Sequence, residues 1–369
     1  ELLSALGGTA THAGQVVNER SAMGVGAVYA SVGLIAGAIA SMPLSIYERT
    51  ADGRAKADHE YWWLFNEQPH EDWDSATFWE YVVASKLLHG DGFAEIIRPS
   101  RLSSRAIGLQ PHHPLHVDPR KTSGGQLYYV VTDPNTGAQR TVDPADMLQF
   151  RGLGFDGKRS LSPIKAAASQ AIGIALGATE FTGKFFSNGA RPDFAITSEK
   201  PINDDQARLI RTTWANRYGG SSNSHLPAVL SGGLSIKELT MSAEDTQLIA
   251  TLGFSVEEIA RVFGVPPHMI GHTDKTTSWG TGIEQLSIGF VKYTLQRHFK
   301  KIEQEINRKL WPNRARYFVE FLTAGLERGD YKTRMEGYRI AVGRAGEPGW
   351  ITQNEIRKLE NLPPVEGGD

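Results

Sequence analysis

The sequence motif that most clearly suggests a chemical function, here nucleotide binding, is the glycine-rich stretch Gly152-Leu-Gly-Phe-Asp-Gly-Lys158. Its glycines match the dinucleotide pattern G-x-G-x-x-G, and the spacing also nearly matches a phosphate-binding P-loop. A P-loop continues with a Ser or Thr whose hydroxyl binds magnesium, but Arg159 stands there. The next helix start, Ser162-Pro163, comes several residues later, so its amides should not point into the loop. We therefore favour a glycine-rich hinge between two domains, with a nucleotide-binding enzyme using Gly152–Lys158 as the alternative.

Metal chemistry has one candidate, the histidines of His112-His-Pro-Leu-His116. No carboxylate or cysteine accompanies them, and on a strand His112 and His116 would share one face while His113 points to the other. The sequence contains no cysteine, which excludes a disulfide framework, a thiolate zinc site and a cysteine nucleophile. It also lacks an H-E-x-x-H motif and a nucleophile elbow. The sequence thus predicts no catalytic residue, no metal site and no cofactor.

The net charge of the chain limits the kinds of partner that it can bind. The 369 residues include 39 Lys+Arg and 41 Asp+Glu, a net charge of −2, so any nucleic-acid contact must come from local patches. One basic stretch runs from Lys292 to Arg316, where eight basic residues face only Glu303 and Glu305. A solvated helix face, a DNA contact and a contact with a neighbouring subunit all remain open for it.

The elements that would position these residues begin with a mixed α+β unit up to about residue 158. No charged residue occurs between Arg20 and Glu48. This stretch is rich in Ala, Gly and Ser and includes the spacing Gly33-x-x-x-Gly37. This composition favours a buried helix packed closely on its neighbours, with a membrane anchor at Ser21–Tyr47 as a further hypothesis. Asp74 or Ser75 is expected to cap a second, aromatic-rich helix.

Longer helices follow. Ser162-Pro163 predicts the start of a helix that ends at Ser187 and is apolar nearly all round, so its own chain or other subunits must cover it. A small insert of strands and one amphipathic helix comes next. A helix then starts at Ser242 and restarts at Ser255, where Glu258 completes a capping-box spacing. Residues 272–282 lack periodicity and predict a loop, and 283–310 predict a long helix.

Four stretches of the chain form a pattern that is known from one protein family. The most specific is Phe254-Ser-Val-Glu-Glu-Ile-Ala-Arg-Val-Phe-Gly-Val-Pro-Pro-His-Met-Ile-Gly271. The other three are 157–164 with 185–192, 283–310, and 351–369. Together, and in this order along most of the chain, they resemble the HK97-type portal proteins of tailed bacteriophages. The resemblance implies an α+β portal fold with wing, helical stem, small α/β clip and helical crown. It implies assembly as a ring of twelve at one vertex of the viral head.

On that plan the chain has seven parts. They are the wing (1–158), the first stem helix (159–189), the clip (190–240), the second stem helix with the following turn (241–271), the tunnel loop (272–282), the long wing helix and a strand (283–328), and the crown (329–369). The resemblance implies that double-stranded DNA passes through the ring during terminase-driven packaging and during ejection. The motor hydrolyses ATP, which agrees with the absence of a catalytic motif in this sequence.

The resemblance also suggests which residues meet DNA. In the tunnel loop we expect Lys275, Thr276, Thr277, Ser278 and Trp279 to face DNA, with an anchor in the subunit interface as the equal alternative for Trp279. Lys165 and Lys184 on the first stem helix are further candidates. The implied partners are the terminase large subunit, the major capsid and scaffold proteins, and head-completion or adaptor proteins, but no membrane. The implied locations are the capsid vertex of the virion and, during assembly, the host cytoplasm.

Overall fold

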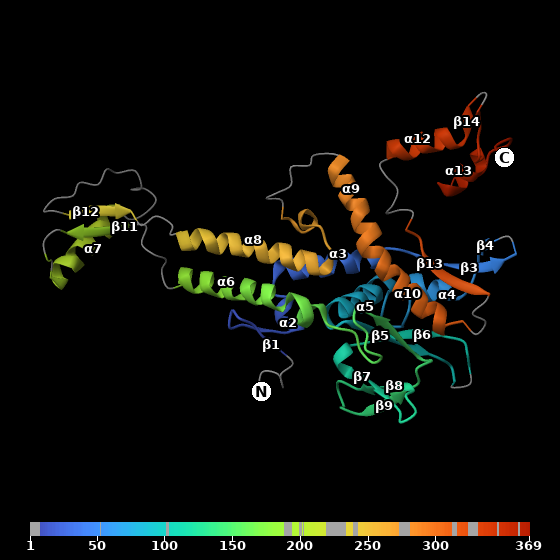
Figure 1. The fold of residues 1–369 in the computed structure, drawn as a ribbon, viewed down its shortest axis with the longest axis horizontal. Coiled ribbons are helices and arrows are strands. Elements are labelled where there is room, and N and C mark those ends of the chain that lie inside the picture. Colours follow the sequence, from blue (N-terminus) through green and yellow to red (C-terminus); the bar gives the residue numbers. More distant parts are fainter. Residues whose placement is uncertain are drawn as a thin grey trace. The chain divides into compact units, whose positions relative to one another are not determined.

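The structure, a computed structural model, describes most of the chain (Figure 1). The described residues are 8–51, 53–100, 103–187, 194–198, 201, 203–218, 234–238, 243–272, 281–311, 316–323, 331–344, 347–360 and 362–369. The chain divides into two compact units, Glu1–Gly173 with Ser255–Asp369, and Ile174–Phe254. Both boundaries fall within helices, α6 (Ser169–Ser187) and α8 (Ala243–Phe263), so each helix contributes residues to both units.

Two packed helices form the centre of the first unit. α3 (Gly26–Ala40) lies against α5 (Ser75–His89) and buries Val28, Val32 and Ile35. The buried helix that the uncharged stretch predicts is therefore confirmed. None of the described helices combines the length and the apolar composition needed to span a bilayer.

The glycines of α3 do not do what their spacing predicts. A Cβ added at Gly33 or Gly37 would meet no atom within 4 Å, so no close helix contact forms there within the described chain. The prediction for the start of α5 is confirmed, because the Asp74 carboxylate accepts a hydrogen bond from the Thr77 N–H at 2.8 Å.

Three antiparallel three-stranded sheets complete the frame of this unit. In one, β5 is central between β10 and β6, and in the second β8 is central between β7 and β9. In the third, the distant strand β13 pairs with β3, which also pairs with β4. The first two sheets enclose a core of Phe93, Val117, Tyr129, Val131, Val142 and Met147. The strand bounds are β3 (Leu44–Thr50), β4 (Gly53–Lys56), β5 (Asp91–Ile97), β6 (Gly108–His112), β7 (Val117–Lys121), β8 (Leu127–Thr132), β9 (Gln139–Val142), β10 (Met147–Arg151) and β13 (Tyr317–Phe321).

The long helix predicted at 283–310 is present and contains a π-helical turn. It consists of α9 (Thr281–Phe290), the π-turn η4 (Val291–Leu295) and α10 (Gln296–Lys309). α10 packs on β13 and β10 through its buried apolar side chains. A second π-turn, η2 (Ile164–Ala168), precedes α6. Such turns hold one extra residue and are not predictable from hydrophobic spacing.

Shorter elements fill out the first unit. They are β1 (Thr9–Ala10), β2 (Val16–Val17), α2 (Glu19–Ala22), α4 (Tyr61–Asn66), and the 3₁₀ turns η1 (Pro114–His116) and η3 (Pro267–Ile270). Near the C-terminus follow α12 (Tyr331–Ala341), β14 (Gly343–Arg344), β15 (Glu347–Pro348) and α13 (Gln353–Leu359).

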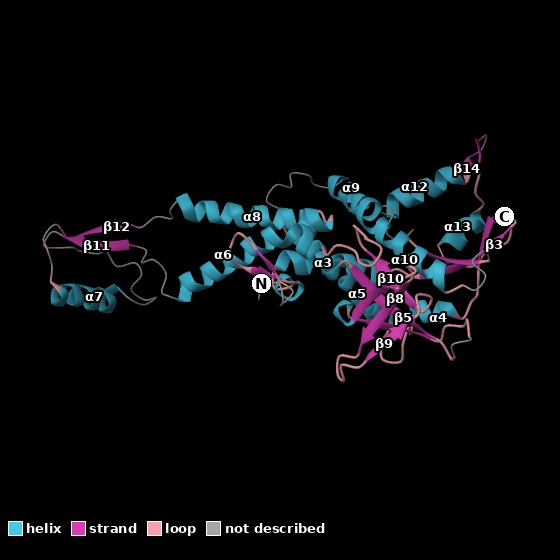
Figure 2. Cartoon of the chain, turned by 60° about the horizontal axis from the view of Figure 1, so that its bottom comes forward, coloured by secondary structure: helices cyan, strands magenta, loops and turns pink. Residues whose placement is uncertain are grey.

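The second unit holds the insert that the sequence predicts. β11 (Phe194–Ser198) and β12 (Leu234–Glu238) form a pair of antiparallel strands (Figure 2). In sequence, α7 (Asp204–Tyr218) lies between these two strands. The end of α6 and the start of α8 belong to the same unit. The restart predicted at Ser255 is wrong, because α8 continues through this residue without a break. Ser255 is buried within the helix, and the continuous backbone hydrogen bonding leaves no free amide for a cap to bind.

Candidate functional site

The backbone amides of the glycine-rich loop at 152–158 form hydrogen bonds with side chains of the loop and of adjoining residues. The Asp156 carboxylate accepts hydrogen bonds from the backbone N–H groups of Lys158 and Arg159, each at 2.8 Å. The Gly152 N–H donates to Ser160 Oγ at 3.0 Å. A phosphate-binding loop keeps such amides free for an anion, whereas here a carboxylate occupies them and would repel a phosphate. This geometry favours a structural role over nucleotide binding.

The glycines of this loop serve close packing. A Cβ at Gly152 would stand 2.4 Å from the carbonyl oxygen of Gly90, so any side chain would force the two chains apart. Gly90 itself ends α5 with a φ of 94° and approaches Leu161 equally closely. Of the three glycines in the pattern, Gly152 is therefore needed where two backbones touch, whereas Gly154 and Gly157 adopt positive φ values of 68° and 96° that favour glycine.

A buried aspartate fixes the end of the loop. Asp91 begins β5 and is fully buried; its carboxylate accepts hydrogen bonds from the backbone N–H and the hydroxyl of Ser160, both at 2.8 Å. Burial raises the pKa of Asp91, although these hydrogen bonds act in the opposite direction. The Lys301 ammonium of α10 donates to the Gly152 carbonyl. Strand, loop and long helix are thus joined at one point.

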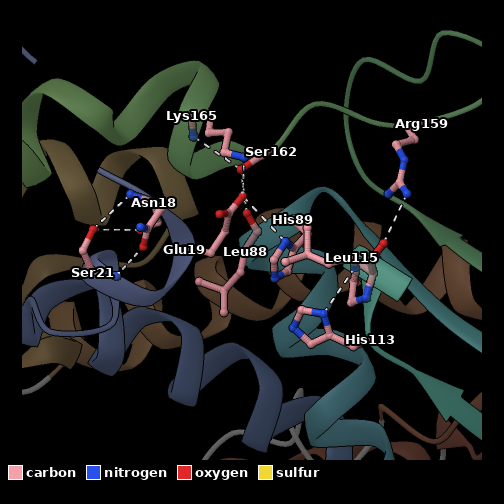
Figure 3. A network of polar contacts seen from close by, with 11 residues as sticks. Asn18, Glu19, Ser21, Leu88, His89, His113, Leu115, Arg159, Ser162 and Lys165 are labelled. Atoms are coloured by element: carbon pink, nitrogen blue, oxygen red, sulfur yellow. Dashed lines mark hydrogen bonds and ion pairs between the residues drawn. The ribbon is translucent and has the colours of Figure 1, made fainter. Parts of the chain in front are cut away.

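The start of the long helix is tied to several elements (Figure 3). Ser162 Oγ donates to the Leu88 carbonyl at 2.6 Å and accepts from the Lys165 N–H at 3.3 Å, as the predicted helix cap requires. Lys165 Nζ lies 3.0 Å from Glu19 Oε1, and the same carboxylate oxygen lies 3.6 Å from His89 Nδ1. Glu19, Leu88 and His89, three residues distant from the helix in sequence, therefore converge on its first turn.

The histidines near this point are packed rather than arranged around a metal. The rings of His89 and His113 meet edge to face at 5.0 Å, and burial lowers the pKa of both, that of His89 to about 4. His112 instead lies 2.9 Å from Glu95, whose carboxylate also binds Arg140. The described residues include no group of three or more His, Asp or Glu side chains placed to hold a metal ion.

The expected alternation of the histidines is wrong. Pro114 starts the 3₁₀ turn η1, which rotates the chain so that the His113 and His116 rings lie 5.4 Å apart. A strand would have placed them on opposite faces.

Most of the eight cationic side chains between Lys292 and Arg316 form ion pairs or hydrogen bonds with other residues of the same chain. Lys300 pairs with Glu303 at 2.9 Å, and Glu305 pairs with both Arg308 and Lys309 at 2.6 and 2.8 Å. Arg316 forms an ion pair with Glu48. Arg297 donates a hydrogen bond to the Phe263 carbonyl, and Lys301 donates one to the Gly152 carbonyl. The Lys292 ammonium lies beside the Tyr293 ring. Arg314 lies outside the described residues. These contacts favour an internal pairing role over a continuous DNA-binding face.

The chain segments on either side of residues 273–280 are hydrogen-bonded to each other. The Thr294 hydroxyl in η4 donates to the Gly264 carbonyl at 2.6 Å, just beyond the end of α8. The Arg297 guanidinium donates to the Phe263 carbonyl at 3.3 Å. These bonds satisfy carbonyl groups that a helix end leaves free, and they join α8 to the π-turn.

The predicted DNA-facing residues divide into three cases. Lys275, Thr276, Thr277, Ser278 and Trp279 lie outside the described residues. The side chain of Lys184 on α6 also lies outside them. Lys165 is described and half-buried, and its ammonium already pairs with Glu19, which reduces its attraction for a phosphate. All seven assignments stay predictions.

The comparisons with known proteins identify the family. The family described as "Phage portal protein" matches residues 26–361. The chain is 31% identical to the portal protein of Enterobacteria phage HK97 over 96% of this chain and 82% of that protein. It is 30% identical to the probable portal protein of Streptomyces phage phiC31 over 98% and 79%. The chain belongs to the phage portal protein family, and the predicted resemblance is confirmed.

A solved structure of similar fold supports the architecture. A chain in the neck of a native gene transfer agent particle, computed with C12 symmetry, matches with a TM-score of 0.69 at 22% identity, over 94% of this chain and 92% of that one. The predicted α+β portal fold agrees with this likeness.

Proposed function

We propose that this protein is the subunit of a twelve-membered portal ring at one vertex of a phage capsid. In this proposal, double-stranded DNA passes through the ring during terminase-driven packaging and during ejection. The observation that carries it is the family match over residues 26–361, together with 31% identity to the HK97 portal protein over nearly the whole chain. The similarity to a chain arranged with twelvefold symmetry supports the ring.

The charges of the chain suit a channel. A wall that held many phosphates would release counterions and bind DNA tightly, which would slow its passage. The net charge is only −2, and most cations of the Lys292–Arg316 stretch have intramolecular partners. α6 and α8 each expose a phenylalanine, Phe181 and Phe254, which neighbouring subunits would cover.

We assign the parts of the chain as the family plan suggests. The clip (190–240) would dock the terminase large subunit and then the head-completion or adaptor proteins, and the wing (1–158) would meet capsid and scaffold proteins. Lys275–Trp279 would face DNA, with Lys165 and Lys184 as further contacts. We also propose that the chain has no catalytic activity, since the motor supplies ATP hydrolysis, and that it occurs in the host cytoplasm before it enters the virion.

Two measurements test the proposal. Multi-angle light scattering and negative-stain electron microscopy of the purified protein should show rings with the mass of about twelve subunits. A protein that stays monomeric at every concentration, or that binds ATP with an affinity lost in Lys158→Ala, would contradict it.

The channel assignment needs a separate test. Lys275→Glu should form normal rings but package DNA poorly in a complementation assay, whereas the exposed Lys358→Glu should package normally. Normal packaging by Lys275→Glu would refute the DNA-facing role of this residue.

A further inference from the structure

The glycine-rich loop presents large apolar side chains to solvent. Leu153 is 83% exposed, and Leu161 and Leu115 are also exposed. The Leu161 N–H donates to the Leu153 carbonyl at 3.0 Å, and Arg159 links the loop to η1 through the Pro114 carbonyl at 3.2 Å. We call Leu115, Leu153 and Leu161 the leucine patch. These hydrogen bonds hold it in place, and the part of the chain that the structure describes leaves it exposed.

Two lysines border the leucine patch. The Lys121 ammonium stands 2.7 Å from the position a Cβ would take at Gly157, so it lies directly against the loop. Lys158 is part of the loop and is exposed. Neither ammonium forms an ion pair with a carboxylate of the described residues. The same loop carries the exposed carboxylate of Asp156, which offsets one of these two charges. The rim of the leucine patch therefore has a net positive charge.

A second uncovered apolar surface lies on α4 and the start of β6. Trp63 is 57% exposed, and Trp62 and Ile107 are exposed beside it. Trp63 separates two surface concavities of about 550 and 400 Å³ and lines both. We call Trp62, Trp63 and Ile107 the tryptophan patch. Exposed tryptophans flanked by hollows are typical anchors of protein interfaces.

The surroundings of the tryptophan patch are acidic. Between Lys56 and Lys86 the sequence has seven Asp and Glu and no Lys or Arg. Asp58 and Glu71 line the two concavities, are exposed, and form no ion pair with the described residues. Lys56 and Arg105 also line the concavities, and Arg105 pairs with Glu60, but the three acids Asp58, Glu60 and Glu71 outnumber these two cations. The rim of the tryptophan patch thus has a net charge opposite to that of the leucine patch.

The two patches lie at opposite ends of one strand. Ile107 directly precedes β6 and Leu115 follows it in η1. The five residues of β6, about 17 Å of extended chain, lie between them together with His113 and Pro114. Two different, complementary patches on separate ends of a rigid sheet cannot meet within one chain. Patches placed in this way can bind each other only between copies, head to tail, and such contacts close into rings when the rotation permits.

We propose that the tryptophan patch of one copy binds the leucine patch of the next copy, with Glu71 opposite Lys158. This inference rests on the ring assembly of the proposed function and assigns one of its contacts. The tryptophans bury apolar area against the leucines, and the opposite charges select the orientation.

Charge reversal at the two rims tests the pairing. In rings of Glu71→Lys alone a lysine faces Lys158, and in rings of Lys158→Glu alone a glutamate faces Glu71. Each single variant should raise the subunit concentration for half-maximal ring formation about tenfold, and the double variant should return to within about threefold of the wild type. The control pair is Glu366→Lys and Lys358→Glu, exposed charges away from both patches, which should change nothing.

A third variant tests the apolar contact. Trp63→Ala should prevent ring formation while circular dichroism and the melting temperature stay close to the wild-type values, because this side chain is exposed in the single subunit. Rings that form equally well in all variants, or a double variant that does not recover, would overturn the pairing and leave the proposed function intact. A wild-type protein that never forms rings would instead refute the proposed function.

Discussion

Replacing Lys86 by methionine is expected to stabilise the subunit and to flatten the pH dependence of its unfolding above pH 7. Lys86 lies on α5 with only 3% of its surface exposed, and its ammonium stands 3.1 Å from Nδ1 of His298 on α10. Burial lowers its pKa to about 7, and the neighbouring Lys301 and Arg297 of α10 act in the same direction, while Asp91 of β5 opposes them. Folding therefore places a lysine among cations and away from water.

The sign and the size of the effect follow from this pKa. Because the unfolded chain binds the proton more tightly than the folded one, the free energy of unfolding rises as the pH increases from about 7 to 10.5. At about 1.4 kcal/mol for each pKa unit, the lowering from 10.5 costs about 5 kcal/mol below pH 7. Methionine fills a similar volume without a charge and forfeits only the hydrogen bond to His298, about 1 kcal/mol.

Urea unfolding of the single subunit, followed by tryptophan fluorescence at half-unit steps from pH 7 to 9.5, measures this. The wild-type free energy of unfolding should rise with pH. That of Lys86→Met should rise less steeply, because burial still lowers the pKa values of Lys301 and Lys309, and it should exceed the wild-type value at pH 7. Lys358→Met, an exposed lysine, is the matched control and should keep the wild-type slope. A Lys86→Met variant that also keeps that slope would refute the burial argument.

Three further predictions concern other contacts of the first unit. Gly90→Ala should lower the free energy of unfolding by about 3 kcal/mol or more, measured by urea titration, because its φ is 94° and a backbone carbonyl oxygen lies 2.5 Å from the new Cβ. Thr294→Val, which loses the bond to the Gly264 carbonyl, should increase amide hydrogen exchange at the end of α8, whereas Thr294→Ser should not. Hydrogen bonds with His112 and Arg140 hold the pKa of Glu95 at about 2 against the effect of burial, so this carboxylate stabilises the fold above pH 4.5 and ceases to do so as the pH falls toward 2. Arg140→Gln should therefore show less loss of stability than the wild type between pH 4.5 and 3, and an equal loss would refute the assignment.

The positions of most elements could be predicted from the sequence because local signals are strong. Asp74 and Ser162 stand where helix starts need hydrogen-bond acceptors, and both accept those bonds. Part of the pairing in the basic stretch was also visible, since Lys300 and Glu303 are three residues apart on one helix. The burial of Lys86 had a signal as well: it follows Trp79, Val82 and Val83 at helical spacing on the buried face.

Other features depend on contacts between distant residues. The pairing of Arg316 with Glu48 requires β13 to align with β3, and nothing in either segment specifies the other. The glycine pattern at Gly152 looked like a phosphate loop because the sequence does not show that Gly90 fills the space beside it. Small residues meet the needs of a ligand and of a neighbouring backbone equally well, and only the fold distinguishes them.

The hydrogen bond from Thr294 to Gly264 has an evolutionary consequence. It fixes the distance between Gly264 and Thr294, so a substitution between these residues need not change how the end of α8 lies against η4. Mutations can therefore accumulate in the intervening stretch while the frame on either side of it keeps its geometry.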